Sequence, residues 1–370
     1  MKRERVLVIS NMYPSESSPT FGIFVKNQVE ALREQGLTVD VVAIQNPDTQ
    51  RKGILTKYMM WMLKAFFLLF VGYRYKVVHA HYVFPSGVLG LVYKKIWKSK
   101  FVVTAHGGDI HKMAKINRIT GDLTKLVLTQ ADHVIAVGQT LYQEIHQEYG
   151  VGTSKLSIIS MGVNRSVFMP QSQENARKII GKPNGEQMIL FVGNLIEAKG
   201  VKELIQAFEQ VKEVKPNASL HLIGRVASES FYNQVQQMVA ENGLADVFFH
   251  GPMSQKDVAN WMAASDVFVL PSYNEGFGLV ALEAMSCHTP VVASDVGGLS
   301  FLLADGAGIL IKPKDSGSLY DGLMEVLENE TLRQELVKKG EILAKENDQN
   351  YLLSKILEIY GDREKSRALS

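Results

Sequence analysis

Apolar and amphipathic segments alternate along the whole chain. Short apolar runs bounded by Gly, Pro or polar residues predict buried strands, and longer stretches with apolar residues three or four positions apart predict helices. In the first half, the pattern predicts strands at 6–10, 39–44, 77–81, 101–106 and 134–137, and helices near 24–35, within 55–71, near 87–97 and near 141–148. Strands that alternate with helices favour a parallel sheet with helical crossovers.

Segment 157–168 has the pattern of a joint between two domains, and after it the alternation of predicted strands and helices begins again. In the second half, the pattern predicts strands at 188–192, 219–224, 247–250, 267–270, 291–293 and 308–311, and helices at 201–214, 231–242, 255–264 and about 277–286. A chain of 370 residues is also too long for one ordinary core. We therefore expect the α/β fold class with two Rossmann-like domains, residues 1–165 and 166–345, and a C-terminal segment, residues 346–370.

The composition is that of a globular protein, with 46% apolar and 21% charged residues. Because Cys287 is the one cysteine of the chain, an intramolecular disulfide and a multi-cysteine zinc site are excluded. The apolar run at 6–9 is too short for a signal peptide, and no cleavage-site pattern follows it. We therefore expect the protein to stay inside the cell.

The formal net charge of +2 hides an asymmetry between the two halves. Residues 1–165 contain 21 Lys and Arg against 11 Asp and Glu, whereas the remainder contains 19 against 27. Residues 51–100 contain ten basic residues and no acidic one. Such a polarised chain indicates that the first half faces an anionic partner.

Two carboxylates flank a predicted helix start in the segment PSYNEGFGLVALE, residues 271–283. The helix is expected from about Phe277, where free N–H groups and the positive end of the helix dipole suit a phosphate. Glu275 precedes that start, and Glu283 is expected about two turns into the helix. Carboxylates accept hydrogen bonds from sugar hydroxyls. Alternatively, Glu275 caps the helix and Glu283 is solvated, although the apolar neighbours of Glu283 make an unpaired charge there costly.

A lysine stands directly before a predicted helix in the segment LFVGNLIEAKG, residues 190–200. A cation is poorly placed at a helix N-terminus unless an anion binds there, so Lys199 favours a phosphate site over an ordinary solvated lysine. The segment TAHGGD, residues 104–109, exposes His106 at the carboxyl end of another predicted strand. On position alone, His106 is equally well explained as a structural histidine bonded within a turn.

These segments resemble the signature elements of glycosyltransferase family 4, whose members are retaining enzymes with the GT-B architecture. Residues 275–283 match its E-x7-E signature, residues 190–200 are similar to its V-G-R-L-x-x-x-K-G element, and residues 106–109 match H-G-x-D. The resemblance runs from about residue 5 to 360 and is strongest over 188–313. Similar in character are bacterial cell-surface polysaccharide enzymes of the teichuronic acid and exopolysaccharide type.

The resemblance implies two domains that face a cleft, with the acceptor bound by the N-terminal domain and the nucleotide-sugar by the C-terminal one. It also implies a final helix, at about 350–360, that returns to the N-terminal domain. In the family, the residues matching Glu275 and Glu283 contact the donor sugar and ribose, the one matching Lys199 binds the diphosphate, and the one matching His106 approaches the reacting carbon. The family has Arg where this chain has Asn194.

We therefore expect His106, Glu275 and Lys199 to be catalytic. The residues expected to bind the donor are Gly22, Gly193, Asn194, Lys199, Gly224, Arg225, Met253, Glu275, Gly276, Phe277, Gly278, Leu279 and Glu283. Gly22 belongs to the loop 13–24, which lies over the phosphates in the family, and Met253 to the loop whose backbone holds the base. Arg225 follows a predicted strand and is a second candidate cation.

Two features leave alternatives open. His79 and His81 share one face of a predicted strand, as metal ligands would, but no further His or Asp series completes a zinc site. Segment 57–71 is interrupted by Lys64 and is too short to span a bilayer, which takes about 20 apolar residues. It is either a helix buried against the sheet or an interfacial helix on anionic lipid.

The function expected is a retaining glycosyltransferase that moves a sugar from a UDP- or GDP-linked donor to an acceptor hydroxyl, without metal or cofactor. The expected partners are the donor, a saccharide or lipid-linked acceptor, and an anionic membrane surface contacted through residues 51–100, with no nucleic acid. The expected location is the cytoplasm, peripheral on the inner face of the cell membrane. The rivals are a nucleotide-sugar epimerase of GT-B fold, a non-catalytic nucleotide-sugar-binding module and, more distantly, a zinc amidohydrolase.

Overall fold

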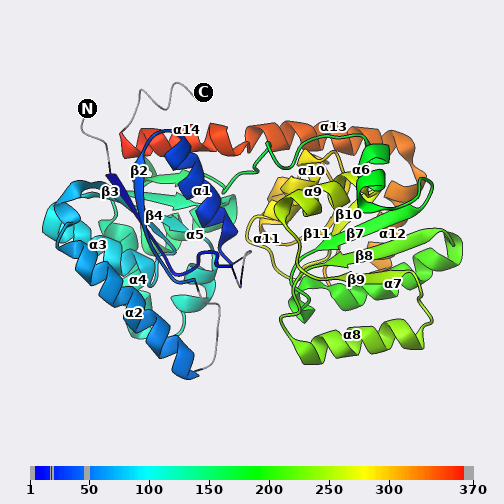
Figure 1. The fold of residues 1–370 in the computed structure, drawn as a ribbon, viewed down its shortest axis with the longest axis horizontal. Coiled ribbons are helices and arrows are strands. Elements are labelled where there is room, and N and C mark those ends of the chain that lie inside the picture. Colours follow the sequence, from blue (N-terminus) through cyan, green and yellow to red (C-terminus); the bar gives the residue numbers. More distant parts are fainter. Residues whose placement is uncertain (1–4, 17, 19–20, 46–50, 362–370) are drawn as a thin grey trace. The chain divides into compact units, whose positions relative to one another are not determined.

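The chain forms two compact α/β units, here described from a computed structural model (Figure 1). Unit 1 comprises residues 1–161 and 349–370, and unit 2 comprises residues 162–348. The structure describes residues 5–16, 18, 21–45 and 51–361, without the side chains of residues 51–55.

Unit 1 is built on a six-stranded parallel sheet in the order β2-β1-β3-β4-β5-β6. Its strands are β1 (Arg5–Ser10), β2 (Thr38–Ala43), β3 (Tyr75–His81), β4 (Lys100–Ala105), β5 (His133–Ala136) and β6 (Leu156–Ile158). Both faces of the sheet are covered, which is why β1 and β4 are near-continuous apolar runs. The neighbours β1 and β3 lead to strands on opposite sides of them, so their carboxyl ends form a topological switch point.

Helices α1 (Ile23–Glu34) and α14 (Gln349–Tyr360) cover one face of this sheet, and α2 (Arg51–Leu69) and α3 (Ser86–Trp97) cover the other. The two remaining α-helices described in unit 1 are α4 (Arg118–Gln130) and α5 (Gln139–Tyr149). A π-helical turn, η2 (Asp109–Met113), follows β4. Leu353, Ile356 and Leu357 of α14 pack with Val25 and Val29 of α1, so the C-terminal helix completes the core of unit 1.

Helix α2 buries one side and exposes the other. Trp61 and Ala65 are buried, and the Trp61 indole Nε1 donates to the carbonyl oxygen of Val42 at 3.1 Å. Six apolar side chains of α2 have exposed fractions between 48 and 67%, namely Met59, Met60, Met62, Leu63, Phe66 and Phe67. Helix packing against the sheet is therefore confirmed for one side of α2, and lipid contact of the other side stays a prediction. None of the helices within the described ranges is both long enough and apolar enough to span a membrane.

Unit 2 is built on a second six-stranded parallel sheet, in the order β12-β11-β10-β7-β8-β9. Its strands are β7 (Gln187–Val192), β8 (Ala218–Ile223), β9 (Val247–His250), β10 (Val267–Leu270), β11 (Val291–Ser294) and β12 (Ile309–Ile311). Counted in chain order within the unit, this is the 3-2-1-4-5-6 arrangement of a Rossmann sheet. Its switch point lies between β7 and β10.

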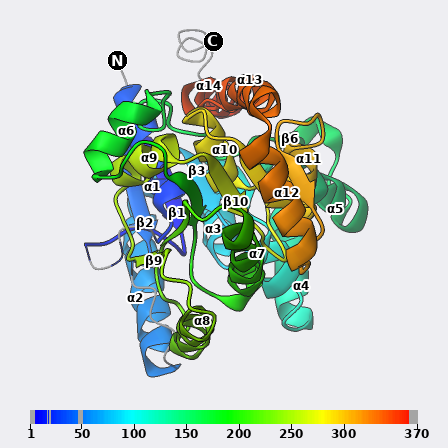
Figure 2. The ribbon, with the colours of Figure 1, turned by 90° about the vertical axis from the view of Figure 1, so that its right-hand side faces the viewer.

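The helices of unit 2 cover both faces of its sheet (Figure 2). Helices α7 (Val201–Val214), α8 (Glu229–Glu241) and α12 (Ser316–Glu328) pack together on one face. Helices α6 (Gln173–Ile180), α9 (Gln255–Ala264), α10 (Leu279–Ser286) and α13 (Glu330–Glu346) pack together on the other. A short helix, α11 (Gly297–Leu302), follows β11. The predicted α/β class with two Rossmann-like sheets is confirmed.

Candidate donor site

The loops that follow β7 and β10 meet at the switch point of unit 2. The amide of Tyr273 donates to the carbonyl oxygen of Ala198 at 2.9 Å, which ties the two loops together. Gly200 has a φ of 68°, and a Cβ there would lie 2.0 Å from the carbonyl oxygen of Pro271. Only glycine fits this close approach of two backbones. The contact therefore holds Lys199, the preceding residue, against the loop that carries Glu275.

Lys199 and Glu275 form an ion pair across these two loops. The Lys199 Nζ lies 2.5 Å from Oε2 of Glu275, and the side chains are 24% and 20% exposed. The hydroxyl of Ser272 donates to the same carboxylate oxygen at 3.4 Å. An ammonium has three N–H donors, so Lys199 can hold Glu275 and still donate to a ligand.

Helix α10 begins beside this pair with its backbone donors free. It starts at Leu279, two residues later than predicted, because Gly278 adopts a left-handed conformation with a φ of 90° and acts as the N-cap. No side chain caps the helix, and its first turn contains no acidic residue. Among the residues that the structure describes, none accepts the amide hydrogens of Phe277, Gly278 and Leu279. These donors and the helix dipole together suit an anion.

Glu283 lies on α10 at the fifth position of the helix, one turn in rather than the two turns predicted. The later helix start accounts for the difference. The side chain is half-buried among apolar neighbours, and burial raises the pKa of its carboxyl to about 8. The carboxyl is therefore largely protonated at neutral pH, and in this form it both donates and accepts hydrogen bonds.

Gly193, Asn194, Gly224 and Arg225 lie together where β7 and β8 end. A Cβ on Gly224 would lie 1.8 Å from the carbonyl oxygen of Gly193, and the amide of Leu195 donates to the carbonyl oxygen of Arg225 at 2.9 Å. The side chains of Asn194 and Arg225 are exposed. Two further predicted donor residues of unit 2 also lie at this edge: Met253 follows β9 and packs partly buried against the core, and Gly276, which is exposed, lies two residues before the N-cap of α10.

Gly22 and His106 belong to unit 1, where they lie near its switch point. Gly22 has a φ of 70°, and a Cβ there would come within 2.6 Å of the Met12 backbone. Phe24, two residues later, contacts His106 with ring centroids 5.0 Å apart. In the loop 13–24, positions 17, 19 and 20 lie outside the described residues.

Asp109 holds the turn that carries His106. Its buried carboxylate accepts from the amide of His106 at 3.1 Å and from that of Val83 at 2.7 Å. The imidazole of His106 contacts His81, whose Nδ1 lies 3.2 Å from the Nε2 of His106. Burial, with a smaller contribution from His81, lowers the pKa of His106 well below its ordinary value. His106 is therefore neutral at physiological pH.

Three stacked imidazoles connect His106 to the C-terminal helix. His79 stacks on His81, and its two ring nitrogens lie 2.6 Å from the hydroxyl of Tyr360 and 2.7 Å from that of Thr104. With both nitrogens engaged, His79 has none left for a metal. The described ranges contain no cluster of three His, Cys, Asp or Glu side chains arranged to hold a metal ion.

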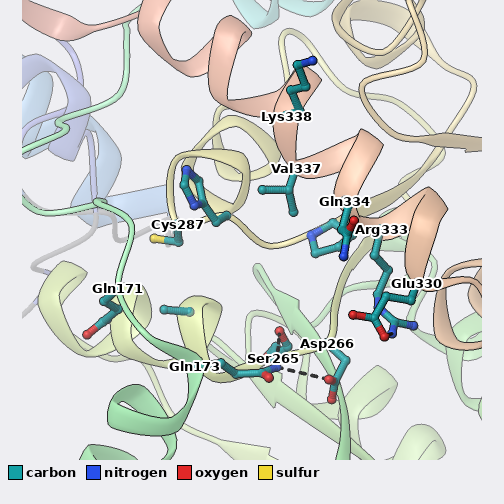
Figure 3. A pocket seen from close by; sticks show the side chains of 13 residues that line it. Gln171, Gln173, Ser265, Asp266, Cys287, Glu330, Arg333, Gln334, Val337 and Lys338 are labelled. Carbon is teal, nitrogen blue, oxygen red and sulfur yellow. Dashed lines mark hydrogen bonds and ion pairs between the residues drawn. The ribbon is translucent and has the colours of Figure 1, made fainter.

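A cavity of about 610 Å³ lies elsewhere in unit 2 (Figure 3). Asp266 and Pro290 line it, and each directly precedes a strand, so the cavity opens at the amino ends of β10 and β11. The predicted donor residues lie at the carboxyl ends. Cys287 and His288, at the far end of α10, also line it, together with residues of α13.

Sequence comparison matches two families to this chain. The family described as glycosyl transferases group 1 matches residues 172–369, more than half of the chain, and the one described as glycosyltransferase family 4 matches residues 22–167. The chain is 30% identical to D-inositol 3-phosphate glycosyltransferase of Paenarthrobacter aurescens over 71% of its own length and 67% of the relative's. It is 27% identical to TuaC of Bacillus subtilis, a glycosyltransferase assigned to teichuronic acid biosynthesis, over 86% and 88% of the two lengths.

Solved structures give the same result. Sucrose-phosphate synthase from Thermosynechococcus elongatus is similar over the full length of both chains, with a TM-score of 0.80 and 25% identity. HepE from Anabaena, solved with UDP-glucose, has a TM-score of 0.76 at 20% identity, and the match covers 96% of this chain and 99% of HepE. At this identity, the similarity to HepE shows the fold alone. These findings do not favour the epimerase or the non-catalytic module. The chain belongs to the group 1 glycosyl transferases and is a glycosyltransferase with the GT-B fold.

Proposed function

We propose that this glycosyltransferase moves a sugar from a UDP- or GDP-linked donor, with retention of configuration, to a hydroxyl of a lipid-linked saccharide at a membrane surface. The observation that supports the donor side is the Lys199–Glu275 pair beside the free N-terminus of α10. Together they offer an ammonium, a carboxylate and backbone donors at a Rossmann switch point, which suits a ligand made of phosphate and sugar.

In the proposed reaction, the bond between the anomeric carbon and the diphosphate oxygen breaks, and its electron pair stays with the diphosphate. Lys199 and the amides of Phe277 to Leu279 stabilise the charge that develops there. Glu275 accepts hydrogen bonds from the sugar hydroxyls, and Glu283 holds the ribose. The acceptor oxygen bonds to the anomeric carbon on the face that the diphosphate leaves, and its proton passes to the departing diphosphate oxygen.

The relatives support the choice of substrates. HepE was solved with UDP-glucose, TuaC is assigned to teichuronic acid biosynthesis, and the Paenarthrobacter relative takes a phosphorylated inositol by its name. A nucleoside-diphosphate sugar and an anionic or polysaccharide acceptor agree with all three. The excess of basic residues in the first half of this chain also suits an anionic acceptor.

The exposed side of α2 supports a membrane surface as the place of the acceptor. Phe66 and Phe67 of α2, and Phe70 directly after its last residue, are each more than half exposed. Residues 51–100 contain ten basic residues and no acidic one. Apolar side chains that enter the headgroup region, flanked by cations, bind anionic bilayers. An anionic lipid surface is therefore the proposed occupant of this side of α2.

Transfer assays test the reaction. The protein is incubated with UDP- and GDP-sugars and with lipid-linked saccharides from a bacterial membrane extract, and products are identified by mass spectrometry. The anomeric configuration of a product is read by NMR. A product of inverted configuration would overturn retention, and binding of every donor without transfer to any acceptor would overturn the proposed activity.

Vesicle flotation tests the membrane contact separately. The protein should float with vesicles of phosphatidylcholine and phosphatidylglycerol and less with phosphatidylcholine alone, and replacing Phe66, Phe67 and Phe70 together with Ser should abolish flotation. A matched control replaces Ile179, Val214 and Ile342, three exposed apolar side chains of unit 2, with Ser. Equal flotation of the two triple variants would contradict the role of α2.

A further inference from the structure

Arg225 is held at the carboxyl edge of the unit 2 sheet, next to the strand at the switch point. Beyond the ends of β7 and β8 the chain segments remain paired, because Gly193 donates to the carbonyl oxygen of Ile223 and Leu195 to that of Arg225, each at 2.9 Å. Leu195 and Val226 form a parallel bridge one residue further on. The backbone of Arg225 is therefore fixed beside Asn194.

The side chain of Arg225 differs from the other arginines of unit 2. The guanidinium of Arg165 binds Glu341 at 2.8 Å, that of Arg177 binds Asp266 at 2.8 Å, and that of Arg333 binds two carbonyl oxygens of α12. Arg225 is exposed, and within the described part of the chain its guanidinium has no hydrogen bond or ion pair. An arginine on a fixed backbone with all its donors free is available to a ligand.

The loops at this edge of the sheet provide little positive charge for a diphosphate. In the described loops that follow β7, β8, β9 and β10, the cationic residues are Lys199 and Arg225. Lys199 is already paired with Glu275 at 2.5 Å, so the two charges largely offset each other. A nucleoside diphosphate brings more than one negative charge to the site. Arg225 is then the uncompensated cation of these loops.

We propose that Arg225 is a diphosphate-binding residue, whose guanidinium donates to phosphate oxygens of the nucleotide held at the start of α10. Asn194, at the end of the neighbouring strand, is uncharged and therefore contributes no cation to this edge of the sheet. The planar guanidinium suits two phosphate oxygens at once, which a lysine does not. This inference rests on the proposed nucleotide-sugar function and names the residue that supplies its second cation.

Calorimetric titration of the full chain tests this role. UDP, GDP and inorganic pyrophosphate are the probes, and uridine and guanosine serve as ligands without phosphate. Hydrogen bonds to charged groups predict that Arg225→Ala weakens binding of the diphosphates about 10- to 100-fold. The affinity for the nucleosides should not change. Lys178→Ala, which removes an exposed cation from α6 of the same unit, is the matched control and should bind like the wild type.

A second variant relocates the charge. Because positions 194 and 225 lie side by side, Asn194→Arg in the Arg225→Ala background should restore most of the lost affinity for diphosphates. Unchanged diphosphate affinity in Arg225→Ala, or an equal loss for nucleosides and diphosphates, would overturn the role of Arg225 alone. A wild-type protein that binds neither diphosphate nor pyrophosphate would overturn the proposed function as well.

Discussion

The Nδ1 of His81 lies 3.2 Å from the Nε2 of His106, and the two rings stack with their centroids 5.4 Å apart. His81 is buried, and its Nε2 has no partner among the described residues. One imidazole must donate to the other, so the tautomers of the two rings are coupled: if His106 carries its proton on Nε2, His81 accepts at Nδ1 and carries its own proton on Nε2. The sequence offered His81 only as a metal candidate, and the structure makes it a neighbour of the predicted catalytic histidine.

Acid should destabilise unit 1 through this pair. Burial lowers the pKa of His81 to about 3, from about 6.5 in an unfolded chain. Below pH 6.5 the unfolded state binds more protons than the native state, so stability is present above that pH and is lost as the pH falls toward 3. Calorimetric melting between pH 7.5 and 4.5 should show a smaller decrease for His81→Asn than for the wild type. Equal decreases for the wild type and His81→Asn would contradict the lowered pKa of His81.

Removing Lys199 should lower turnover strongly. Loss of one preorganised donor to a developing negative charge lowers kcat about 10²- to 10³-fold in other enzymes, and Lys199→Ala should fall in this range. The measurement is steady-state transfer with a saturating donor. Lys202→Ala removes a nearby cation that lies over the Phe231 ring and should keep nearly wild-type turnover. If Lys199→Ala and Lys202→Ala had the same rate, Lys199 would not belong to the site.

Transfer should continue in excess EDTA. In the proposed mechanism, Lys199 and the amide groups at the start of α10 carry the charge of the leaving diphosphate. The expected result is the same initial rate with EDTA as without it, measured on protein first passed through a chelating resin. A rate that EDTA abolishes and Mg²⁺ or Mn²⁺ restores would show that a metal takes this role.

Glu283→Gln should change the pH dependence of stability. The pKa of Glu283 is about 8 in the native state and near 4.3 in an unfolded chain, so the native state binds more protons between these values. Its stabilising effect is present below pH 4.3 and is lost as the pH rises toward 8. Glutamine cannot ionise, and the variant should gain stability relative to the wild type as the pH rises from 5 to 8.5. Thermal melting across this range measures the difference, and parallel curves would contradict the raised pKa.

Gly224→Ala should disrupt the donor site, whereas Gly243→Ala should only weaken unit 2. A Cβ at position 224 would collide with the carbonyl oxygen of Gly193, whereas at Gly243 a Cβ meets nothing within 4 Å. Gly243 has a φ of 64°, so alanine there costs about 1–2 kcal/mol of backbone strain. Urea unfolding should show that cost for Gly243→Ala and a larger loss for Gly224→Ala. Equal losses would show that the backbones at 193 and 224 can separate at little cost.

Most strands were predicted, because buried parallel strands are near-continuous apolar runs, as in β7 and β8. The strand β6 was missed, since it has only three residues and most of it lies in the segment expected to join the two halves. Helix α13 was not predicted. Its buried residues are Leu336, Gly340 and Ala344, a stripe of period four in which two members are too small to stand out among the surrounding charges. Helix α11 was not predicted either, and it begins with two glycines, which are poor helix formers.

Most residues of the proposed donor site could be named from the sequence because they follow an apolar run that ends in a turn; Glu283, inside α10, is an exception. The pairing of Lys199 with Glu275 could not be predicted, because it depends on β7 lying next to β10. The local sequence pattern does not reveal the order of the strands in a sheet. The same holds in unit 1, where His81 meets His106 because β3 pairs with β4 in the register that places His81 beside Thr104. Long-range register decided both contacts.

The place of α14 determines the order in which the chain can fold during synthesis. Unit 2 is one continuous segment and has all its residues once position 348 has left the ribosome. Unit 1 is made first, yet the apolar face of α1 awaits Leu353, Ile356 and Leu357. The first unit whose translation begins is thus the last to close its core, and a nascent chain carries that open face until α14 has been made.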